Sequence, residues 1–217
     1  MARTAIATDN FNRADAPGLG PNWGNVGQFA TSSGVMRINA SINIYGGGGG
    51  PSAARWVGAG AFTADQYSSL VLTGTGTDFS YVGVIARASA DQDAARDYYL
   101  YRMRGIFGTT DLVKCVNGVE TTLSATPATL TWVDGDRIEI ECEGTTIRGL
   151  QNGVVRHTAT DSSLTTGAPG VFGAHVSVVP PFGDDWEGGN ITAGSLIFPG
   201  VITDSSTILG NPFMQLA

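Results

Sequence analysis

The chain has 217 residues, of which 42% are hydrophobic and 14% charged, and its formal net charge is −7. This composition supports a folded domain and excludes a disordered chain, and the acidic charge disfavours binding to nucleic acid or to an anionic membrane surface. No apolar run is long enough to span a bilayer, and residues 1–11 lack the apolar core of a secretion signal.

Alternation of apolar and polar residues, the period of a β-strand, runs through most of the chain, and no long window has the period of a helix. Asn117-Gly118 predicts a hairpin over 111–124, and Glu143-Gly144 and Asn152-Gly153 predict a three-strand meander over 137–158. Together the patterns predict an all-β, antiparallel two-sheet sandwich. The expected strands are 26–30, 34–39, 67–74, 81–89, 97–104, 111–116, 119–125, 136–144, 145–151, 154–160, 170–178 and 190–197.

Two segments depart from the strand pattern. Residues 45–52 read YGGGGGPS, which we interpret as a long loop, because the stretch lacks the lysine and hydroxyl residue of a phosphate-binding loop. Residues 198–217 carry prolines and glycines that prevent a regular helix, and we expect an extended C-terminal arm after a sandwich domain of residues 1–197. The apolar residues of this arm are expected to pack on a neighbouring subunit: Val201, Ile202, Ile208, Leu209, Phe213, Met214 and Leu216.

The opening stretch DNFNRADAPGLGPNW resembles the start of concanavalin A-like jelly-roll domains of the laminin-G-like type. The residues that carry the resemblance are Asp9, Phe11, Asn12, Arg13, Leu19, Gly20 and Trp23. Similarity continues to the stretch DDWEGGNI and covers roughly residues 5–196. The resemblance implies a jelly-roll sandwich, and domains of this type bind sugars, cleave glycans or act as structural modules.

In a jelly-roll the first and last strands tend to lie side by side, so residues 9–11 are expected next to residues 186–191. Phe11 and Trp186 would then fill the core, and Trp23 would seal one end of the sandwich. A partly buried ion pair is expected to join one of two arginines to one of two aspartates: Arg13, Arg87, Asp15 and Asp185.

Versions of this domain recur in bacteriophage virion proteins, including minor tail proteins. Because the chain also has no secretion signal and ends in an apolar arm, we predict a non-enzymatic virion structural protein of the tail tip or fibre, made in the host cytoplasm. Its partners would be copies of itself, other virion proteins and a host-surface glycan. The alternatives are a capsid decoration protein, and a secreted-type carbohydrate-binding module or glycoside hydrolase.

The stretch EIECE, residues 139–143, is the candidate for glycosidase chemistry. It resembles the Glu-Ile-Asp-x-Glu strand of laminarinase-type glycosidases, with Glu141 in place of the central Asp. Strand alternation puts Glu139, Glu141 and Glu143 on one face and apolar residues on the other, which is also the pattern of an ordinary outer strand with solvent-facing glutamates. We therefore predict that the protein is not an enzyme.

Other candidate sites are few. His157 and His175 have no neighbours at zinc-ligand spacing, and Cys115 and Cys142 are expected to be free buried thiols. Calcium is a possible cofactor, and none is required. Its predicted oxygen ligands are Asp9, Asn10, Asp184 and Asp185. Four aromatic residues are candidates for stacking on sugar rings, although core positions are the alternative: Tyr45, Trp56, Trp132 and Phe182.

Overall fold

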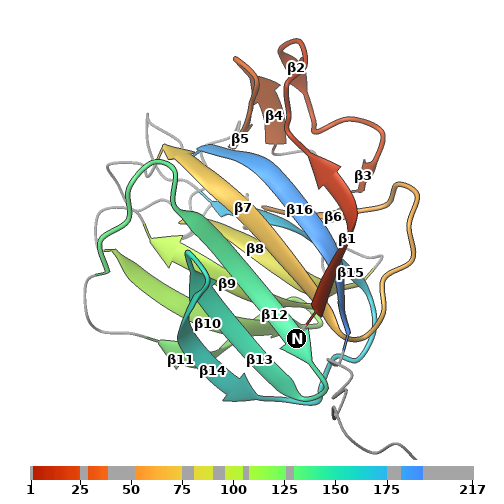
Figure 1. Ribbon diagram of the computed structural model, residues 1–217, viewed down its shortest axis with the longest axis vertical. Helices are drawn as coiled ribbons and strands as arrows, with labels where there is room; N and C mark the ends of the chain where they lie inside the picture. The colour runs from red at the N-terminus through yellow and green to blue at the C-terminus, as the bar shows by residue number, and fades with distance from the viewer. Residues whose placement is uncertain are drawn as a thin grey trace, which may run out of the picture.

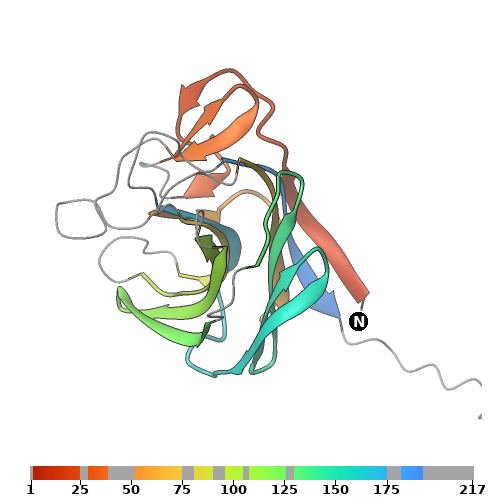
Figure 2. The same ribbon diagram turned by 90° about the vertical axis from the view of Figure 1, so that its left-hand side faces the viewer.

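The computed structural model describes residues 2–24, 29–38, 52–74, 81–89, 96–104, 108–125, 130–174 and 182–192. Every regular element in these ranges is a β-strand, and the strands form two antiparallel sheets packed face to face (Figures 1 and 2). The expected all-β, two-sheet sandwich is confirmed. The described residues include no helix that is long and apolar enough to cross a membrane.

The first sheet has nine strands, which include the first and the last strand of the described chain. In spatial order it consists of β14 (Val154–Thr160), β13 (Thr146–Gln151), β12 (Arg137–Glu143), β7 (Gln66–Gly74), β16 (Phe182–Thr192), β5 (Val35–Ile38), β4 (Phe29–Ser32) and β2 (Ala16–Pro17), with β1 (Ala2–Asp9) paired to β16. The second sheet has seven strands, in the order β11 (Val119–Ala125), β10 (Thr109–Val116), β9 (Tyr98–Arg104), β8 (Tyr81–Ala88), β15 (Ala168–Ala174), β6 (Ser52–Trp56) and β3 (Trp23–Gly24).

The predicted turns are confirmed. Asn117 and Gly118 have φ angles of 51° and 76°, and Asn152 and Gly153 have φ angles of 52° and 75°. Positive φ at both central positions is the signature of the tight hairpin turn whose twist matches that of the strands. The first pair joins β10 to β11, and the second joins β13 to β14, which completes the three-strand meander that begins at β12.

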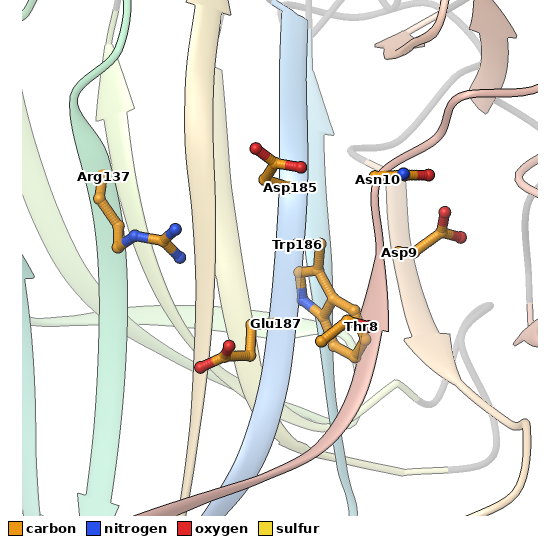
Figure 3. A pocket seen from close by; sticks show the side chains of 7 residues that line it. All are labelled: Thr8, Asp9, Asn10, Arg137, Asp185, Trp186 and Glu187. Carbon is orange, nitrogen blue, oxygen red and sulfur yellow. The ribbon is translucent and has the colours of Figure 1, made fainter.

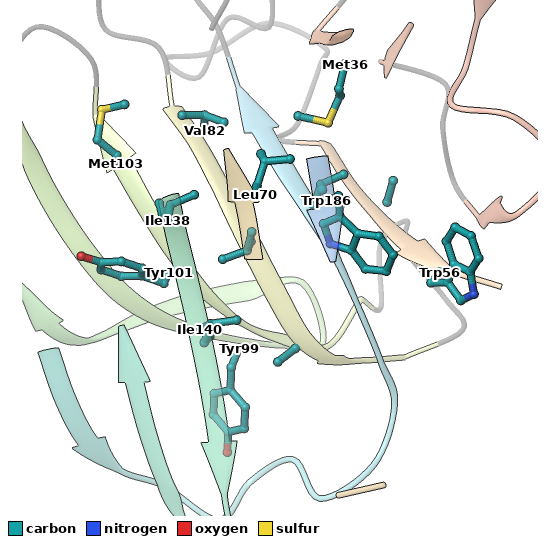
Figure 4. Packing of buried hydrophobic residues seen from close by; sticks show 14 of the residues in the cluster. Met36, Trp56, Leu70, Val82, Tyr99, Tyr101, Met103, Ile138, Ile140 and Trp186 are labelled. Carbon is teal, nitrogen blue, oxygen red and sulfur yellow. The ribbon is translucent and has the colours of Figure 1, made fainter. Parts of the chain in front are cut away.

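The main core lies between the two sheets and follows from strand alternation. Tyr99, Tyr101 and Met103 of β9 face Ile138 and Ile140 of β12, and all five are fully buried (Figure 4). A second buried apolar cluster lies on the opposite face of the seven-stranded sheet. It contains Ala53, Ile85, Ala88, Tyr98, Leu100, Val113, Cys115, Phe172 and Ala174. Strands β8 and β9 are therefore apolar on both faces, which explains why they read as nearly continuous apolar runs.

An aromatic cluster fills one end of the core. The ring of Trp23 lies 4.7 Å from Trp186 and 5.4 Å from Trp56, measured between ring centroids, and Phe11 lies 5.9 Å from Trp23. The indole nitrogen of Trp186 donates a 2.9 Å hydrogen bond to Ser68 Oγ, so its polar atom is also satisfied. The predicted core positions of Phe11, Trp23 and Trp186 are confirmed.

The first and last strands do pair, but over a longer stretch than the sequence predicted. Ala2 lies opposite Thr192, and Asp9 lies opposite Trp186. The last strand runs from residue 182 to 192, whereas the sequence predicted regular strand alternation over 190–197 and pairing with the first strand from residue 186. The reason is its sequence, FGDDWEGGNIT, in which glycines and paired aspartates hide the strand alternation that pairing with neighbours imposes.

Several predictions fall outside the described residues. They concern the glycine run at 45–52 apart from residue 52, residues 193–197, and the arm at 198–217 with all seven of its apolar residues: Val201, Ile202, Ile208, Leu209, Phe213, Met214 and Leu216. Both cysteines are described, and they are buried and free, as expected. Cys142 lies in the main core, where burial raises the pKa of its thiol to about 12.

Candidate functional site

A polar cleft of about 450 Å³ opens on the outer face of the nine-stranded sheet, where β1, β16 and β12 come together (Figure 3). Arg137 of β12 and Glu187 of β16 extend over β7, the strand between them, and Asp185 projects from β16. Thr8, Asp9, Asn10 and Trp186 complete its lining. The cleft carries one guanidinium group and three carboxylates, and its exposed atoms are mostly polar.

An irregularity in β16 creates the cleft. The register of β16 against β7 shifts between Asp184 and Glu187, which inserts an extra residue as a β-bulge. Asp185, inside the bulge, has a φ angle of 45°, a left-handed conformation that Asp tolerates better than most residues. The bulge directs Trp186 into the core, and Glu187 faces outward, where its carboxylate accepts a 2.7 Å hydrogen bond from Tyr67.

Asp9 has a structural role at the end of β1. Its Oδ1 accepts a 2.8 Å hydrogen bond from the Phe11 amide and also binds the Arg13 guanidinium, and its Oδ2 accepts a 2.7 Å bond from the Trp23 indole. In Figure 3 the Asp9 side chain points away from Arg137 and Glu187, which lie on the other side of the cleft. The opening motif thus folds back on itself around one carboxylate. Arg13 pairs with Asp9, which corrects the expected pairing with Asp15 or Asp185.

The predicted calcium ligands lie in one region, but they are largely committed to the protein. Both oxygens of Asp9 are bonded, Asn10 Oδ1 accepts from the Asn12 amide, and Asp184 Oδ1 accepts from the Asp185 amide. Burial raises the pKa of Asp184, and the negative charges of Asp185 and Asp9 add to that rise. Within the described ranges no three His, Cys, Asp or Glu side chains gather as a metal site, so calcium stays a prediction.

A charged network lies beside the cleft and involves the candidate glycosidase residues. Arg3 of β1 donates hydrogen bonds of 2.8 and 2.6 Å to the two oxygens of Glu139, and bonds of 2.5 and 3.2 Å to Glu141 Oε1. Both glutamates are more than nine-tenths buried, which corrects the expectation of a solvent-facing row. Burial raises the pKa of Glu139, and the hydrogen bonds and charge of Arg3 oppose that rise.

Gly189 of β16 gives this network its space. A Cβ at this position would lie 2.2 Å from the carbonyl oxygen of Thr4 and 2.7 Å from the ring of Tyr67. Without a side chain, β16 can pair closely with β1 while the Tyr67 ring lies over the strand. The Arg3 guanidinium crosses that ring at 5.2 Å from its centroid on its way to the glutamates. The tail of the DDWEGGN motif therefore serves packing and the ion-pair network.

Replacing Arg3 by alanine is expected to lower the free energy of unfolding by about 2 kcal/mol at pH 7. Removing one partner of a buried ion pair costs about 3–5 kcal/mol, and this figure is reduced because the Arg3 side chain is 35% exposed. The variant also raises the pKa of Glu139 further. A carboxyl whose pKa is raised by folding stabilises the fold at low pH and loses that contribution as pH rises above its ordinary value of 4.5.

The loss caused by Arg3→Ala should therefore shrink as the pH falls toward 4.5. Urea denaturation at several pH values measures it. Adding Glu139→Gln and Glu141→Gln to Arg3→Ala is expected to recover most of the stability at pH 7. An equal loss at every pH would show that packing of the arginine, and not its charge, matters.

Two of the four aromatic residues proposed for sugar stacking belong to the core. Trp56 and Trp132 are only 8% and 9% exposed and belong to the main core, which corrects their assignment as exposed stacking residues. The Trp56 ring is stacked against the Trp186 ring, and their centroids lie 5.3 Å apart. Tyr45 and the side chain of Phe182 lie outside the described part of the structure.

His157 closes the sandwich on the side away from the cleft. It lies on β14 of one sheet, and its ring nitrogens hydrogen-bond to Thr110 Oγ1 of β10 at 2.6 Å and Ser124 Oγ of β11 at 3.0 Å. Burial lowers the pKa of His157, and the negative charge of Asp111 only partly opposes this. His175 lies outside the described residues.

Stability is therefore expected to depend on His157 below pH 6.5. Because folding lowers its pKa, the unfolded chain takes up a proton first as the pH falls below the ordinary value of 6.5, and the fold loses stability over that window. The variant His157→Gln, which cannot titrate, should remove this part of the pH dependence. Urea denaturation between pH 5 and 8 measures the difference, and parallel profiles for the two proteins would contradict the prediction.

Sequence patterns missed three residues of this region. Arg3, Arg137 and Glu187 are the charged groups that organise the outer face, yet they come from the first strand, a middle strand and the last strand of the described chain. The signal available in the sequence was the alternation of charged residues opposite Ile138 and Ile140. It places Arg137 on the face of Glu139, but it cannot reveal the strand β1 that crosses nearby.

Comparisons with known proteins support the fold. The structure is similar to carbohydrate-binding module CBM66 from Bacillus subtilis, with a TM-score of 0.57 and 16% identity over 76% of this chain and 95% of that chain. It is also similar to the β-glucanase of Bacillus licheniformis, with a TM-score of 0.53 and 13% identity over 87% and 99% of the two chains. A Bacillus subtilis protein of unknown function with a galectin-like fold has a TM-score of 0.55 and 9% identity over 87% and 97%.

Identities this low establish the fold alone, and the fold is a concanavalin A-like jelly-roll, as the opening motif implied. None of the curated protein sequences matches the chain. A family model described as "Domain of unknown function (DUF7257)" matches residues 2–172, which include β1, the Arg3 network and most of both sheets. The chain therefore belongs to the DUF7257 family.

Proposed function

We propose that this protein is a non-catalytic glycan-binding module of a bacteriophage virion and that it binds a neutral glycan in the cleft between β1, β16 and β12. The polar lining of the cleft carries the proposal. A sugar offers many hydroxyl groups that both donate and accept hydrogen bonds. Asp185 and Glu187 supply acceptors, and Arg137 supplies donors, within a volume of about 450 Å³ that suits a small saccharide.

The arrangement of Glu139 and Glu141 supports a non-catalytic role. A glycosidase needs one carboxylic acid that protonates the leaving group and one carboxylate that attacks, or activates water, at the sugar. Here Arg3 holds both oxygens of Glu139 and Oε1 of Glu141, and the two side chains are 4% and 9% exposed. A raised pKa is common in catalytic acids, and the pKa of Glu139 is raised as well. Here, however, Arg3 covers the Glu139 carboxylate.

The virion setting rests on the resemblance of the opening and closing motifs to laminin-G-like jelly-roll domains, versions of which recur in bacteriophage virion proteins. The similarity of the fold to a carbohydrate-binding module is compatible with recognition of a host-surface glycan. Copies of this module in a tail tip or fibre would bind by avidity, because many weak sites on one particle act together. Immunogold electron microscopy of virions tests the setting, and labelling of no virion surface would reject it.

Binding to a glycan array of neutral, amino and acidic glycans tests the molecular function. We expect binding that falls about tenfold or more in Asp185→Asn and in Arg137→Gln, because each removes a charged hydrogen-bonding group. Asn also tolerates the left-handed conformation at position 185, so the backbone is preserved. Asp134→Asn is the matched control, since Asp134 is exposed and lies outside the cleft.

An assay for reducing sugars on the bound glycan tests for catalysis. No release is expected from the wild type. Release that is lost in Glu139→Gln would overturn the non-catalytic assignment. Equal binding by the wild type and both cleft variants would show that the glycan binds elsewhere.

A further inference from the structure

A second cleft lies at one end of the sandwich, where β6, β8 and β9 meet the segment 163–168. Its two lobes have volumes of about 400 and 310 Å³ and adjoin at two shared lining residues, Arg55 and Gly167. One lobe is lined mainly by polar residues: Arg87, Ser89, Asp97, Ser163, Thr165 and Thr166. The other is lined mainly by apolar residues: Trp56, Val57, Phe62 and Ala168.

Arg55 is a cation that has no partner for its side chain among the residues that the structure describes. Its backbone is fixed on β6 by pairing with Gly170 of β15 and Gly24 of β3. Its side chain is partly exposed, and its guanidinium has no hydrogen bond or ion pair with any residue in the described ranges. A guanidinium has five N–H donors in a planar fork, which matches the geometry of a carboxylate, sulfate or phosphate group.

Arg87 adds a second positive charge to the same cleft. Its guanidinium is buried and donates to three backbone carbonyls, at 2.8 Å each, from Ala64, Leu164 and Gly144. The Asp65 carboxylate lies 3.8 Å from the Arg87 guanidinium, and the Asp65 side chain is 42% exposed. Among the described residues that line the cleft, Arg55 and Arg87 carry two guanidinium groups and Asp97 carries the one carboxylate, while Asp65 pairs with Arg87 from outside the lining. This balance is the reverse of that in the first cleft and stands out in a chain of net charge −7.

We infer that this second cleft binds the acidic group of an anionic saccharide, with Arg55 as the residue that holds the carboxylate, sulfate or phosphate. The exposed hydroxyl groups of Thr165 and Thr166 lie beside it as hydrogen-bond partners for the anion or for sugar hydroxyls. The lobe with Val57 and Phe62 adjoins Arg55, and its exposed surface is mainly polar with these two side chains as its apolar part, which suits a sugar ring that has both hydroxyl groups and a C–H face. A bare anion would leave that lobe unused.

This inference does not depend on the function proposed for the first cleft. The two sites use different residues and have opposite charge balances, so they select different parts of a glycan or different glycans.

Nuclear magnetic resonance titrations of the full chain test the inference, with glucuronate, glucose 6-phosphate, glucose and inorganic phosphate as probes. We expect both acidic sugars to shift the Arg55 Nε–H signal and the amide signals of Thr165 and Thr166, with tighter binding than either glucose or inorganic phosphate. Arg55→Gln is expected to weaken that binding about tenfold or more, because a charged hydrogen bond is lost. It should leave the melting temperature unchanged, since the guanidinium has no partner in the described structure.

Arg156→Gln is the matched control, because it removes the same charge from an exposed position on β14. Equal weakening in Arg55→Gln and Arg156→Gln would overturn the inference and indicate a general effect of net charge. Inorganic phosphate binding as tightly as glucose 6-phosphate would overturn the saccharide assignment. Loss of neutral-glycan binding in Asp185→Asn with retention of glucuronate binding would show that the two clefts act separately.

Discussion

Trp186→Ala is expected to lower the free energy of unfolding by about 3–5 kcal/mol, the range for removal of a large buried aromatic side chain. Trp186 is 1% exposed, lies at the centre of the aromatic cluster, and contacts the rings of Trp23 and Trp56. The variant also leaves Ser68 Oγ without the indole donor that it has at 2.9 Å. Because a domain's total stability is commonly about 5–15 kcal/mol, we expect a large drop in melting temperature.

Differential scanning calorimetry measures this drop, and Trp186→Phe is the matched variant. Phenylalanine keeps most of the apolar volume but lacks the indole N–H, so it should retain more than half of the stability that alanine loses. A loss of less than about 1 kcal/mol of unfolding free energy in Trp186→Ala would mean that the aromatic cluster contributes little to the stability of the fold.

Arg87→Met is expected to be nearly as costly, at about 3–5 kcal/mol. The arginine ties three separate segments together by donating to the carbonyls of Ala64, Leu164 and Gly144. Methionine fills similar volume but leaves three carbonyl oxygens without their donor, and each buried unsatisfied group costs about 1–3 kcal/mol. Water can reach a part of this end of the sandwich and can replace some of the lost hydrogen bonds. The total loss of stability is therefore expected near the lower end of the sum of the three separate costs.

Chemical denaturation measures the effect of Arg87→Met, with Arg156→Met as the control at an exposed site. Arg87→Lys should lose somewhat less, because an ammonium keeps the charge but cannot span three carbonyls with the planar guanidinium geometry. If Arg87→Met and Arg156→Met were equally stable, the hydrogen bonds of Arg87 would contribute nothing measurable.

The sequence predicted the fold where local patterns decide it. Strands with regular alternation, such as β12 with Ile138 and Ile140, and turns with Asn-Gly pairs were found at nearly their observed bounds. The strands β1, β6 and the first half of β16 were missed. Their residues are small or polar, and they become strands because a neighbour offers a hydrogen-bonding edge, which no local pattern reports.

The candidate sites were harder to predict, because they depend on pairings between distant segments. Glu139 and Glu141 were found as a pair, but Arg3 lies 136 and 138 positions away, and its position over them follows only from the register of β1 on β16. Arg87 was expected to pair with Asp15 or Asp185, and it lies instead 3.8 Å from Asp65 and donates to backbone carbonyls of three segments. Asp9 was placed correctly near Trp186, but its partners, Arg13 and Trp23, come from its own loop.

Because β1 pairs with β16, the first and the last described residues of the sandwich lie side by side. Ala2 and Thr192 are cross-strand neighbours, so their Cα atoms lie about 5 Å apart, a gap that a short linker can bridge. A circular permutant that joins these two residues and begins at Gly153 would keep every ladder between strands, because Asn152 and Gly153 form an exposed hairpin turn. For the same reason, a segment attached before Ala2 and a segment attached after Thr192 both start from one corner of the sandwich.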